Sequence, residues 1–366
     1  MDKESTFTEY GVQSIHCTVC AKPIPGTEKK IELKKGWKEE GSFRMYYYGD
    51  GSSAKDGIVE IEGVEYGFDK EGHTVSGWQI FDGKKYHFAN DGEMMKSQFF
   101  TDETGKYYLS SKGRVKIGWL KMKGVNKYYF DKEGVMQTGI TEIDGDRYFL
   151  NTNGALSRGV WKNLDGKRYH LDPEGRIQTG WQEINGKTFY FAEDGNMCTG
   201  ITKVGSKRYF LNWNGAMSRN TWKTVNGRRY RVSADGSLLT GWQKVNGFTY
   251  HFNSYGVMHT GITKIGKDYY YLHANGALSR HTWKNMNGNR YRVDDDGKVL
   301  VGSQQLFGNW YYFDPARKGA MATGLIRIGG QNYIYGNDGV MRKNCTQEIG
   351  GVIYQVDGYG RAIQVN

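Results

Sequence analysis

Tryptophan is the residue type in this chain that best combines useful chemistry with regular spacing. The tryptophans that recur at fixed intervals are Trp78, Trp119, Trp161, Trp181, Trp222, Trp242 and Trp283. An indole ring offers an apolar face that can stack on a sugar or attract a cation, and one N–H donor. The spacing predicts a row of similar binding sites, and the alternative is that each ring only packs one structural unit on the next.

These tryptophans belong to a repeat of about twenty residues. Pairs such as Gly180-Trp181, Gly200-Ile201 and Gly241-Trp242 share one phase along the chain. Each unit of such an array contacts only its neighbours. A single deep catalytic pocket is therefore not expected.

A longer period is superimposed on the short one. Trp181 and Trp242 are 61 residues apart, and the segments 154–158, 215–219 and 276–280 share the pattern Gly-Ala-x-Ser-Arg. Every third unit is thus alike, which predicts three hairpins per superhelical turn. Duplication of a three-unit block without structural meaning is the alternative.

Residues 242–260 show the anatomy of one unit. Two short alternating runs flank Asn246-Gly247, a pair favoured in type I′ turns because both residues tolerate a positive φ. The same turn is expected at Asp82-Gly83, Asp144-Gly145, Asp165-Gly166, Asn185-Gly186, Asn226-Gly227 and Asn287-Gly288. Each unit is therefore predicted to be a β-hairpin, followed by a second turn such as Asp235-Gly236.

Side chains alternate across the second strand, so Phe248, Tyr250 and Phe252 are expected to pack on one face. The other face is expected to meet solvent, and its basic residues are His87, His170, Arg231, His251 and Arg292. Isolated hairpins are marginally stable in water, so the units must stack. The predicted fold class is all-β, a β-hairpin solenoid of about sixteen repeats over residues 36–366, after an N-terminal segment, residues 1–35.

Composition and charge narrow the functional class. The 366 residues are 38% hydrophobic and 14% aromatic, and carry a formal net charge of +11. This charge either attracts polyanions such as teichoic acid, acidic glycan or nucleic acid, or keeps a tyrosine-rich surface soluble. No stretch approaches the ~20 apolar residues of a transmembrane helix, so membrane insertion is not expected. Residues 1–10 show no apolar signal-peptide core.

The N-terminal segment contains a Cys-x-x-Cys knuckle formed by Cys17 and Cys20. Such a knuckle supplies half of a tetrahedral zinc site, which would need His16, a partner chain or further sequence to complete it. A short disulfide between the two cysteines, or two free thiols, are the alternatives.

Motifs of common catalytic sites are absent from the sequence. It has no His-Glu-x-x-His zinc motif, no Gly-x-Ser-x-Gly elbow and no phosphate-binding glycine loop. The acidic run 294–296 lacks the spacing of a calcium loop and coincides with a recurring turn. Neither enzymatic activity nor a bound cofactor is expected.

The elements Gly-Trp, Gly-x-x-Tyr-x-Phe and Gly-x-Met-x-Thr-Gly recur over residues 36–366. With them the chain resembles the cell-wall-binding repeat superfamily. That superfamily includes choline-binding modules of bacterial surface proteins and lytic enzymes, glucan-binding repeats of glucansucrases and receptor-binding repeats of large clostridial toxins. The resemblance implies a β-hairpin solenoid, which is left-handed with three hairpins per turn in the choline-binding branch.

In that branch the resemblance implies ligand cages between consecutive hairpins. Each cage combines the Gly-Trp tryptophan, the first aromatic residue of the second strand, and an aromatic or Met residue of the following hairpin. The candidate ligand-binding residues are then Trp78, Trp119, Tyr128, Trp161, Trp181, Trp222, Trp242, Trp283, Trp310, Tyr311 and Met321.

The strand position of the cage carries mostly cations in this chain. It is occupied by Lys85, Lys127, Arg147, Arg168, Thr188, Arg208, Arg229, Thr249, Asp268 and Arg290, and only Trp310 keeps an aromatic ring there. A cation beside the cage repels choline. A sugar ring with an anionic substituent therefore suits most of these sites better, through stacking and charge-assisted hydrogen bonds.

The preferred interpretation is a non-catalytic binding array, secreted or on the surface of a Gram-positive type of bacterium. Its expected partners are cell-wall polysaccharide, teichoic acid or host glycan, bound at several weak sites. Choline binding, or an anchoring role in a larger lytic enzyme or toxin, is the alternative. Nucleic-acid binding is not expected, because the basic and aromatic residues are dispersed over all sides of a solenoid. The sequence does not indicate an oligomeric state.

Overall fold

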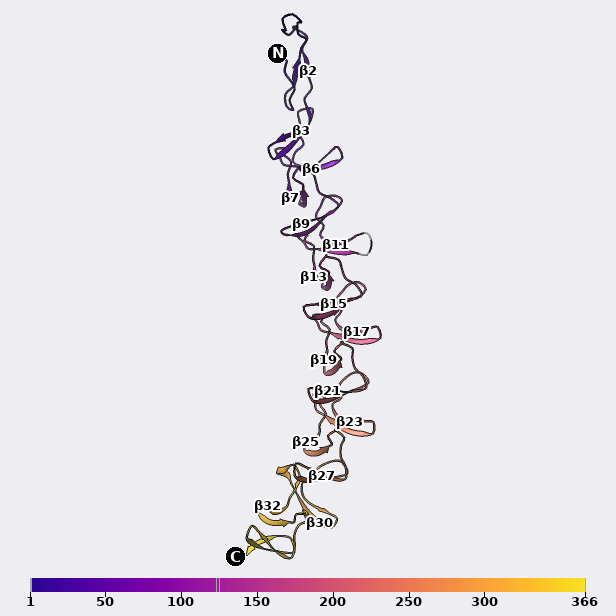
Figure 1. The fold of residues 1–366 in the computed structure, drawn as a ribbon, viewed down its shortest axis with the longest axis vertical. Coiled ribbons are helices and arrows are strands. Elements are labelled where there is room, and N and C mark those ends of the chain that lie inside the picture. Colours follow the sequence, from indigo (N-terminus) through magenta and orange to yellow (C-terminus); the bar gives the residue numbers. More distant parts are fainter. Residues whose placement is uncertain (1, 123, 125, 366) are drawn as a thin grey trace. The chain divides into compact units, whose positions relative to one another are not determined.

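The computed structural model describes residues 2–122, 124 and 126–365, which form a succession of antiparallel hairpins (Figure 1). The chain divides into two compact units, Met1–Gln178 and Thr179–Asn366. The predicted all-β class is confirmed, since the described residues contain strands and one short 3₁₀ turn, η1 (Pro315–Arg317). None of their helical segments has the length and apolar character needed to cross a membrane.

The strands of the first unit pair in sequence order. They are β1 (Gly11–Gln13), β2 (Lys29–Ile31), β3 (Lys35–Glu40), β4 (Phe43–Tyr48), β5 (Gly57–Ile61), β6 (Val64–Phe68), β7 (Gly77–Phe81), β8 (Lys84–Phe88), β9 (Gln98–Asp102), β10 (Gly105–Leu109), β11 (Gly118–Lys121), β12 (Lys127–Phe130), β13 (Gly139–Ile143), β14 (Asp146–Leu150), β15 (Trp161–Leu164) and β16 (Lys167–His170). The first repeat hairpin begins with β3, and the domain boundary at residue 35 stays a prediction.

The second unit continues the same pattern. Its strands are β17 (Gly180–Ile184), β18 (Lys187–Phe191), β19 (Gly200–Val204), β20 (Lys207–Leu211), β21 (Thr221–Val225), β22 (Arg228–Val232), β23 (Gly241–Val245), β24 (Phe248–Phe252), β25 (Gly261–Ile265), β26 (Asp268–Leu272), β27 (Thr282–Met286), β28 (Asn289–Val293), β29 (Gly302–Leu306), β30 (Asn309–Asp314), β31 (Ala320–Met321), β32 (Gly324–Ile328), β33 (Gln331–Tyr335), β34 (Cys345–Ile349), β35 (Val352–Val356) and β36 (Ala362–Val365).

The hairpin turns are of the predicted kind. Asn246 and Gly247 have φ values of 49° and 84°, so both central residues adopt the left-handed conformation that a type I′ turn requires. The Asp-Gly and Asn-Gly pairs named above share this conformation. The turn chemistry therefore sets the register, in which Trp242 faces His251 across the hairpin of β23 and β24.

Consecutive hairpins stack through one buried side chain and one backbone hydrogen bond per repeat. The backbone bond runs from the segment after one hairpin to the preceding hairpin, as when the Leu278 N–H donates to the Thr249 carbonyl at 2.8 Å. The last core residue of each second strand is essentially inaccessible to solvent: Phe68, Phe88, Leu109, Phe130, Leu150, Leu171, Phe191, Leu211, Val232, Phe252, Leu272, Val293 and Phe313. The stacking predicted from the marginal stability of single hairpins is thus present.

The longer period has a structural meaning. Within the second unit, β17 and β23 project to one side and β19 and β25 to another, as expected for three hairpins per turn (Figure 1). The serine of the Gly-Ala-x-Ser-Arg segments is buried: Ser218 donates to Asn212 Oδ1 at 3.0 Å, and that oxygen also accepts from Lys223. The repeated serine therefore satisfies a polar site that recurs with every third hairpin.

One prediction about the strand faces is wrong. The residues expected to meet solvent, His87, His170, Arg231 and His251, are half-buried, and Arg292 is buried with 7% of its surface exposed. The physical reason is the cross-strand tryptophan. In the hairpin of β23 and β24 the Trp242 ring lies 4.8 Å from the His251 ring and covers it.

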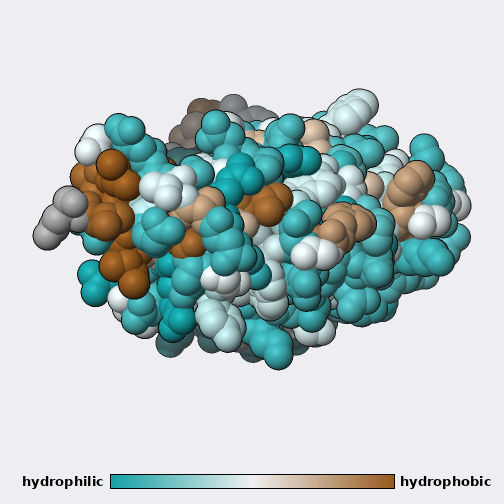
Figure 2. All heavy atoms as spheres, turned by 90° about the horizontal axis from the view of Figure 1, so that it is seen from below, coloured by the Kyte–Doolittle hydropathy of each residue, from teal (hydrophilic) through white to brown (hydrophobic). Residues whose placement is uncertain are grey.

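The surface is mostly hydrophilic. Figure 2 shows one face of the molecule, on which apolar residues gather in a limited area. Among the exposed apolar side chains are Ile353, Ile363 and Val365 of β35 and β36, the last two strands of the chain.

Candidate ligand-binding grooves

The groove between consecutive hairpins is organised around the residue that stands three positions before the last core residue of each second strand, which we call the cap position. Thr249 holds this position in β24 and Arg229 in β22. The backbone carbonyl of each accepts a hydrogen bond from the segment that follows the next hairpin, at 2.8 Å in both cases. The cap side chain therefore belongs to the joint between two repeats.

Six caps are cations that cover the tryptophan of their own hairpin. The distances from the cationic centre to the ring centre are 4.4 Å for Arg44 over Trp37, 4.2 Å for Lys85 over Trp78, 3.8 Å for Lys127 over Trp119, 4.4 Å for Arg168 over Trp161, 4.4 Å for Arg229 over Trp222 and 4.3 Å for Arg290 over Trp283. Each contact contributes about 0.5–2 kcal/mol. The chain thus places its own cations on the ring faces that an external cation or sugar would use.

Two tryptophans have a threonine at the cap position and no cation over the ring. Trp181 and Trp242, capped by Thr188 and Thr249, have 36% and 38% of their surface exposed. No Lys or Arg of the described chain lies within cation–π distance of either ring. These two indole faces are open, and they lie on like hairpins 61 residues apart.

Each open indole is walled by two further rings. Trp181 lies 4.9 Å from Tyr190 across its own hairpin and 4.8 Å from Tyr209 of the next hairpin. Trp242 lies 4.8 Å from both His251 and Tyr270 in the same arrangement. The edge-to-face geometry fixes the orientation of the indole and leaves one face to the solvent. Such a set of π faces suits a quaternary ammonium group.

A basic residue from the serine-containing segment borders the open site at Trp181. Arg219 donates to the Ala234 carbonyl at 2.9 Å and to Thr188 Oγ1 at 3.3 Å. Ala234 is 46 residues after the cap Thr188. Asn275, whose carbonyl accepts a hydrogen bond from the capping Arg229, is likewise 46 residues after that cap. Arg219 therefore makes the hydrogen bond to this backbone carbonyl that a capping arginine makes elsewhere, and the indole face of Trp181 stays uncovered.

Trp310, Tyr311 and Met321 do not form one site. Trp310 is at the cap position of β30 and is 37% exposed, but its hairpin has Ser303 where others have tryptophan. Tyr311 packs on Trp283 at 5.7 Å, in a groove that Arg290 caps. Met321 has only 9% of its surface exposed.

The buried methionine has a packing role. A side chain at Gly339 would place its Cβ 2.3 Å from the Met321 sulfur, which shows that Met321 fills the space under the next hairpin's turn. Met321 was a candidate ligand contact in the sequence analysis, whereas in the structure it packs between two repeats.

Two more aromatic residues, Tyr128 and Trp37, lie in grooves that contain a cation of the chain itself. Tyr128 packs on Phe99 of the preceding hairpin at 5.6 Å, and Lys106 lies over Phe99 at 4.7 Å. Trp37 was missed, although Gly36-Trp37 lies in phase with the later pairs, and it packs on Tyr66 at 4.8 Å. Both grooves contain an internal cation.

One assignment at the cap position is wrong by a single residue. Asp268 was placed there, but Asp268 pairs with Ile265 at the turn, and Tyr269 pairs with Lys264 in the cap register. The two hairpins have the same register, since Val245 pairs with Phe248 and Ile265 pairs with Asp268, so Tyr269 is the residue equivalent to Thr249. Trp310 is therefore not the one aromatic cap, since Tyr269 is another.

Trp78 shows how strongly a capped ring is held. Its Nε1–H donates to Asp102 Oδ2 at 2.8 Å. The Thr104 hydroxyl, followed by this indole N–H, lowers the pKa of Asp102 to about 2, so the acceptor stays charged at neutral pH. With Lys85 over its face, Trp78 serves to pack neighbouring hairpins.

A histidine pair lies beside the open Trp242. His251 Nδ1 and His259 Nδ1 are 2.9 Å apart, and burial lowers the pKa of both imidazoles from the ordinary 6.5, with the charge of His259 lowering that of His251 further. A histidine with a lowered folded pKa contributes stability that is present above its unfolded pKa and lost as pH falls.

We therefore expect the free energy of unfolding to decrease as pH falls below about 6.5. His259→Gln should flatten this dependence, because Gln178 forms the equivalent hydrogen bond to His170 at 2.6 Å without titrating. Urea denaturation at pH 7.5 and pH 5.5 measures the effect. An unchanged pH dependence in the variant would show that the pair does not couple to folding.

The cysteine knuckle is present as a turn with free thiols. Cys17 and Cys20 form no disulfide, and Cys198 and Cys345 are also free. Backbone N–H groups of Val19 and Cys20 lower the pKa of the Cys17 thiol. Among the described residues no group of three or more His, Cys, Asp or Glu side chains could hold a metal. The described residues therefore add no further metal ligand to Cys17 and Cys20.

Comparison with known families places this geometry in context. Residues 75–117, 178–222 and 239–283 match the choline-binding repeat family. The second and third segments contain the hairpins of the open Trp181 and Trp242. No curated protein matches the chain significantly.

The solved structures that match the chain include three proteins of Streptococcus pneumoniae. CbpJ is 25% identical over 66% of this chain and 99% of its own, with a TM-score of 0.48. Choline binding protein F, solved with a peptidoglycan analogue, is 25% identical over 86% of this chain and 100% of its own, with a TM-score of 0.37. The choline-binding domain of CbpL is 27% identical over 52% of this chain and 99% of its own, with a TM-score of 0.36.

Proposed function

We propose that this chain, three segments of which match the choline-binding repeat family, belongs to the cell-wall-binding repeat superfamily and is a non-catalytic module that binds choline-bearing cell-wall polymer. The observation that supports this ligand is the pair of open indole faces at Trp181 and Trp242. Each indole has the centres of two further rings within about 5 Å of its own and no internal cation over it. A trimethylammonium group gains attraction from each π face that it contacts.

The proposal revises the ligand preference drawn from the sequence. Capping cations were expected to disfavour choline and to favour an acidic sugar at most grooves. They instead lie on their own tryptophans, as Arg229 does on Trp222, so these grooves are filled from within. The two threonine-capped grooves are left for an external cation.

Two weak sites are sufficient for attachment to a polymer. A site with millimolar affinity contributes about −4 kcal/mol, and simultaneous use of linked sites raises avidity by about 10² or more. Trp181 and Trp242 occupy equivalent hairpins of one unit, which lets a polymer with repeated choline groups use both. A secreted or cell-surface location follows from such a ligand and is part of the proposal.

Choline titration of the intact protein tests this function. We expect saturable quenching of tryptophan fluorescence by choline at millimolar concentrations, and little change with ethanolamine, which has the same skeleton without the three methyl groups. The protein should also sediment with choline-bearing wall material and be released by free choline. Equal responses to choline and ethanolamine, or attachment to a choline-free glycan that free choline does not reverse, would reject the proposal.

A further inference from the structure

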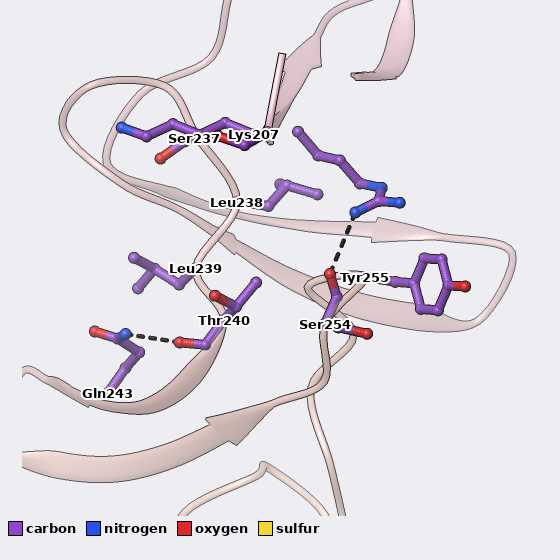
Figure 3. A pocket seen from close by; sticks show the side chains of 10 residues that line it. Lys207, Ser237, Leu238, Leu239, Thr240, Gln243, Ser254 and Tyr255 are labelled. Carbon is purple, nitrogen blue, oxygen red and sulfur yellow. Dashed lines mark hydrogen bonds between the residues drawn. The ribbon is translucent and has the colours of Figure 1, made fainter. Parts of the chain in front are cut away.

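The groove of the Ile201 hairpin has the same position as the tryptophan grooves but a different chemistry. It is a hollow of about 240 Å³ within the second unit, at the joint of the hairpins that contain β19, β21 and β23 (Figure 3). Arg208 of β20 holds its cap position, and Ile201 replaces the tryptophan that would receive the guanidinium. The cation of this cap therefore has no indole to cover.

Arg208 is partly engaged and has no counter-ion. Its Nη1 donates to the Ser254 carbonyl at 3.2 Å, and its guanidinium carbon lies 4.7 Å from the exposed ring of Tyr255. Within the part of the chain that the structure describes, Arg208 forms no ion pair. A guanidinium has five N–H donors, so most of its donor capacity remains for a ligand.

The second cation of the hollow is balanced by a carboxylate outside its lining. Lys207 Nζ lies 2.9 Å from Asp235 Oδ2, and no Asp or Glu lines the hollow itself. The Asp235 carboxylate is held by Ser233 and Ser237, whose hydroxyl groups lower its pKa. Asp235 is thus fully charged at neutral pH and neutralises Lys207, which leaves Arg208 as the uncompensated charge.

Hydroxyl and amide groups surround that charge. Thr240 and Ser254 contribute hydroxyl groups, and Gln243 is held by a hydrogen bond from its Nε2 to the Thr240 carbonyl at 2.8 Å. Figure 3 shows these three side chains together with Lys207. A guanidinium with several neutral donors around it suits a tetrahedral oxyanion, which accepts charge-assisted hydrogen bonds from several directions.

The hollow is linked to the open site at Trp181 by direct contacts within the second unit. Arg219 donates both to Thr188, the cap of Trp181, and to the Ala234 carbonyl. Ala234 directly precedes Asp235, which forms an ion pair with Lys207 at the hollow.

We propose that the Arg208 hollow binds a phosphate group, so that the module holds a phosphate of the polymer as well as its choline. This inference rests on the proposed function for the identity of the polymer but not for the phosphate site itself. The source is either a phosphodiester of the polymer chain or free phosphate. The equivalent position of the next like hairpin is Tyr269, which is not a cation.

Calorimetric titration of the intact protein with choline-free polyglycerol phosphate tests the phosphate site. Arg208→Gln should weaken binding by about tenfold, the loss expected for a charge-assisted hydrogen-bonding group. Arg327→Gln is the matched control, because Arg327 is exposed on β32 of the same unit and undergoes the same change of charge. It should leave the affinity within about twofold, as surface charges contribute little individually.

Two further arms separate the sources and the two proposals. Saturable binding of inorganic phosphate that Arg208→Gln removes would identify the free ion as a ligand, and binding of the polymer alone would identify the phosphodiester. Choline quenching should be unchanged in Arg208→Gln, so that a failure of choline binding is distinguishable from a failure of this site. Equal weakening by the two variants, or the same weakening with hyaluronate, a carboxylate polymer, would overturn the phosphate assignment.

Discussion

Lysine in place of Thr188 and Thr249 should close both open tryptophan faces and lower the affinity for choline by at least about tenfold. The chain itself contains the expected arrangement. Lys127 lies 3.8 Å from the Trp119 ring centre, and Arg158 lies near enough for its charge to lower the pKa of that lysine further than burial alone does. Arg158 belongs to the same repeated segment as Arg219, so Thr188→Lys should reproduce this cap over Trp181.

Two effects both lower the affinity for choline in the lysine variant. A ligand cation that loses one ring face loses about 0.5–2 kcal/mol, and the new ammonium also repels it. A change of 1.4 kcal/mol is about tenfold in affinity. Titration of choline against the intact double variant, followed by calorimetry or tryptophan fluorescence, measures this quantity.

Glutamine at both positions provides the matched control. It has a long side chain without charge, so Thr188→Gln and Thr249→Gln should reduce affinity far less than lysine does. Circular dichroism should show that all variants keep their fold, because the threonines are only half-buried. Equal losses with glutamine and lysine would mean that space rather than charge decides which grooves are open.

Gly276→Ala should be among the most destabilising single substitutions in the second unit. Gly276 has φ +90°, and a Cβ there would lie 2.2 Å from the Met258 sulfur. The positive φ costs an alanine about 1–2 kcal/mol, and forcing the buried methionine aside costs about 1–3 kcal/mol more. We expect a total loss of about 2–5 kcal/mol in the free energy of unfolding, measured by urea denaturation.

Gly247→Ala separates the two contributions. Gly247 has φ +84° but no atom within 4 Å of the position of an added Cβ. It should therefore lose only the conformational part, about 1–2 kcal/mol. If the two variants were equally stable, the methionine contact would not hold neighbouring hairpins together as the structure indicates.

The local structure of this protein was predictable because it depends on short-range rules. Asn246-Gly247 and its equivalents determine hairpin turns from two residues, and alternation places Phe252 in the core. The spacing of Trp181 and Trp242 gave the three-hairpin period. Each of these inferences needs only the residues of one hairpin or the distance between like residues.

Predictions that depend on contacts between hairpins were less successful. The half-buried His251 and the buried Arg292 were taken as solvent-facing, because the tryptophan that covers each is visible only in three dimensions. Met321 was assigned to a ligand site although it fills the space under Gly339. Asp268 was placed one position too early, because the turn Gly266-Lys267 lacks the Asn-Gly or Asp-Gly pair that marks the turn in several other hairpins.

The sequence analysis named Trp181 and Trp242 among the candidates but did not distinguish their open grooves from the capped ones, although a signal for the difference was present. Thr188 and Thr249 stand among cationic residues at the same strand position, and their lack of charge distinguishes them. The meaning of that difference required the structure, which shows that a cationic cap folds over its own indole. The part played by Arg219 could not be anticipated, because it spans the joint between hairpins far apart in sequence.

A crystal structure of the intact protein with bound choline tests the central claim most directly, namely that the chain's own cations decide which grooves accept a ligand. We predict a trimethylammonium group against Trp181 and another against Trp242, with Arg229 still over Trp222 and Arg290 still over Trp283. Choline that displaces either arginine from its ring, or empty grooves at both Trp181 and Trp242, would contradict the account.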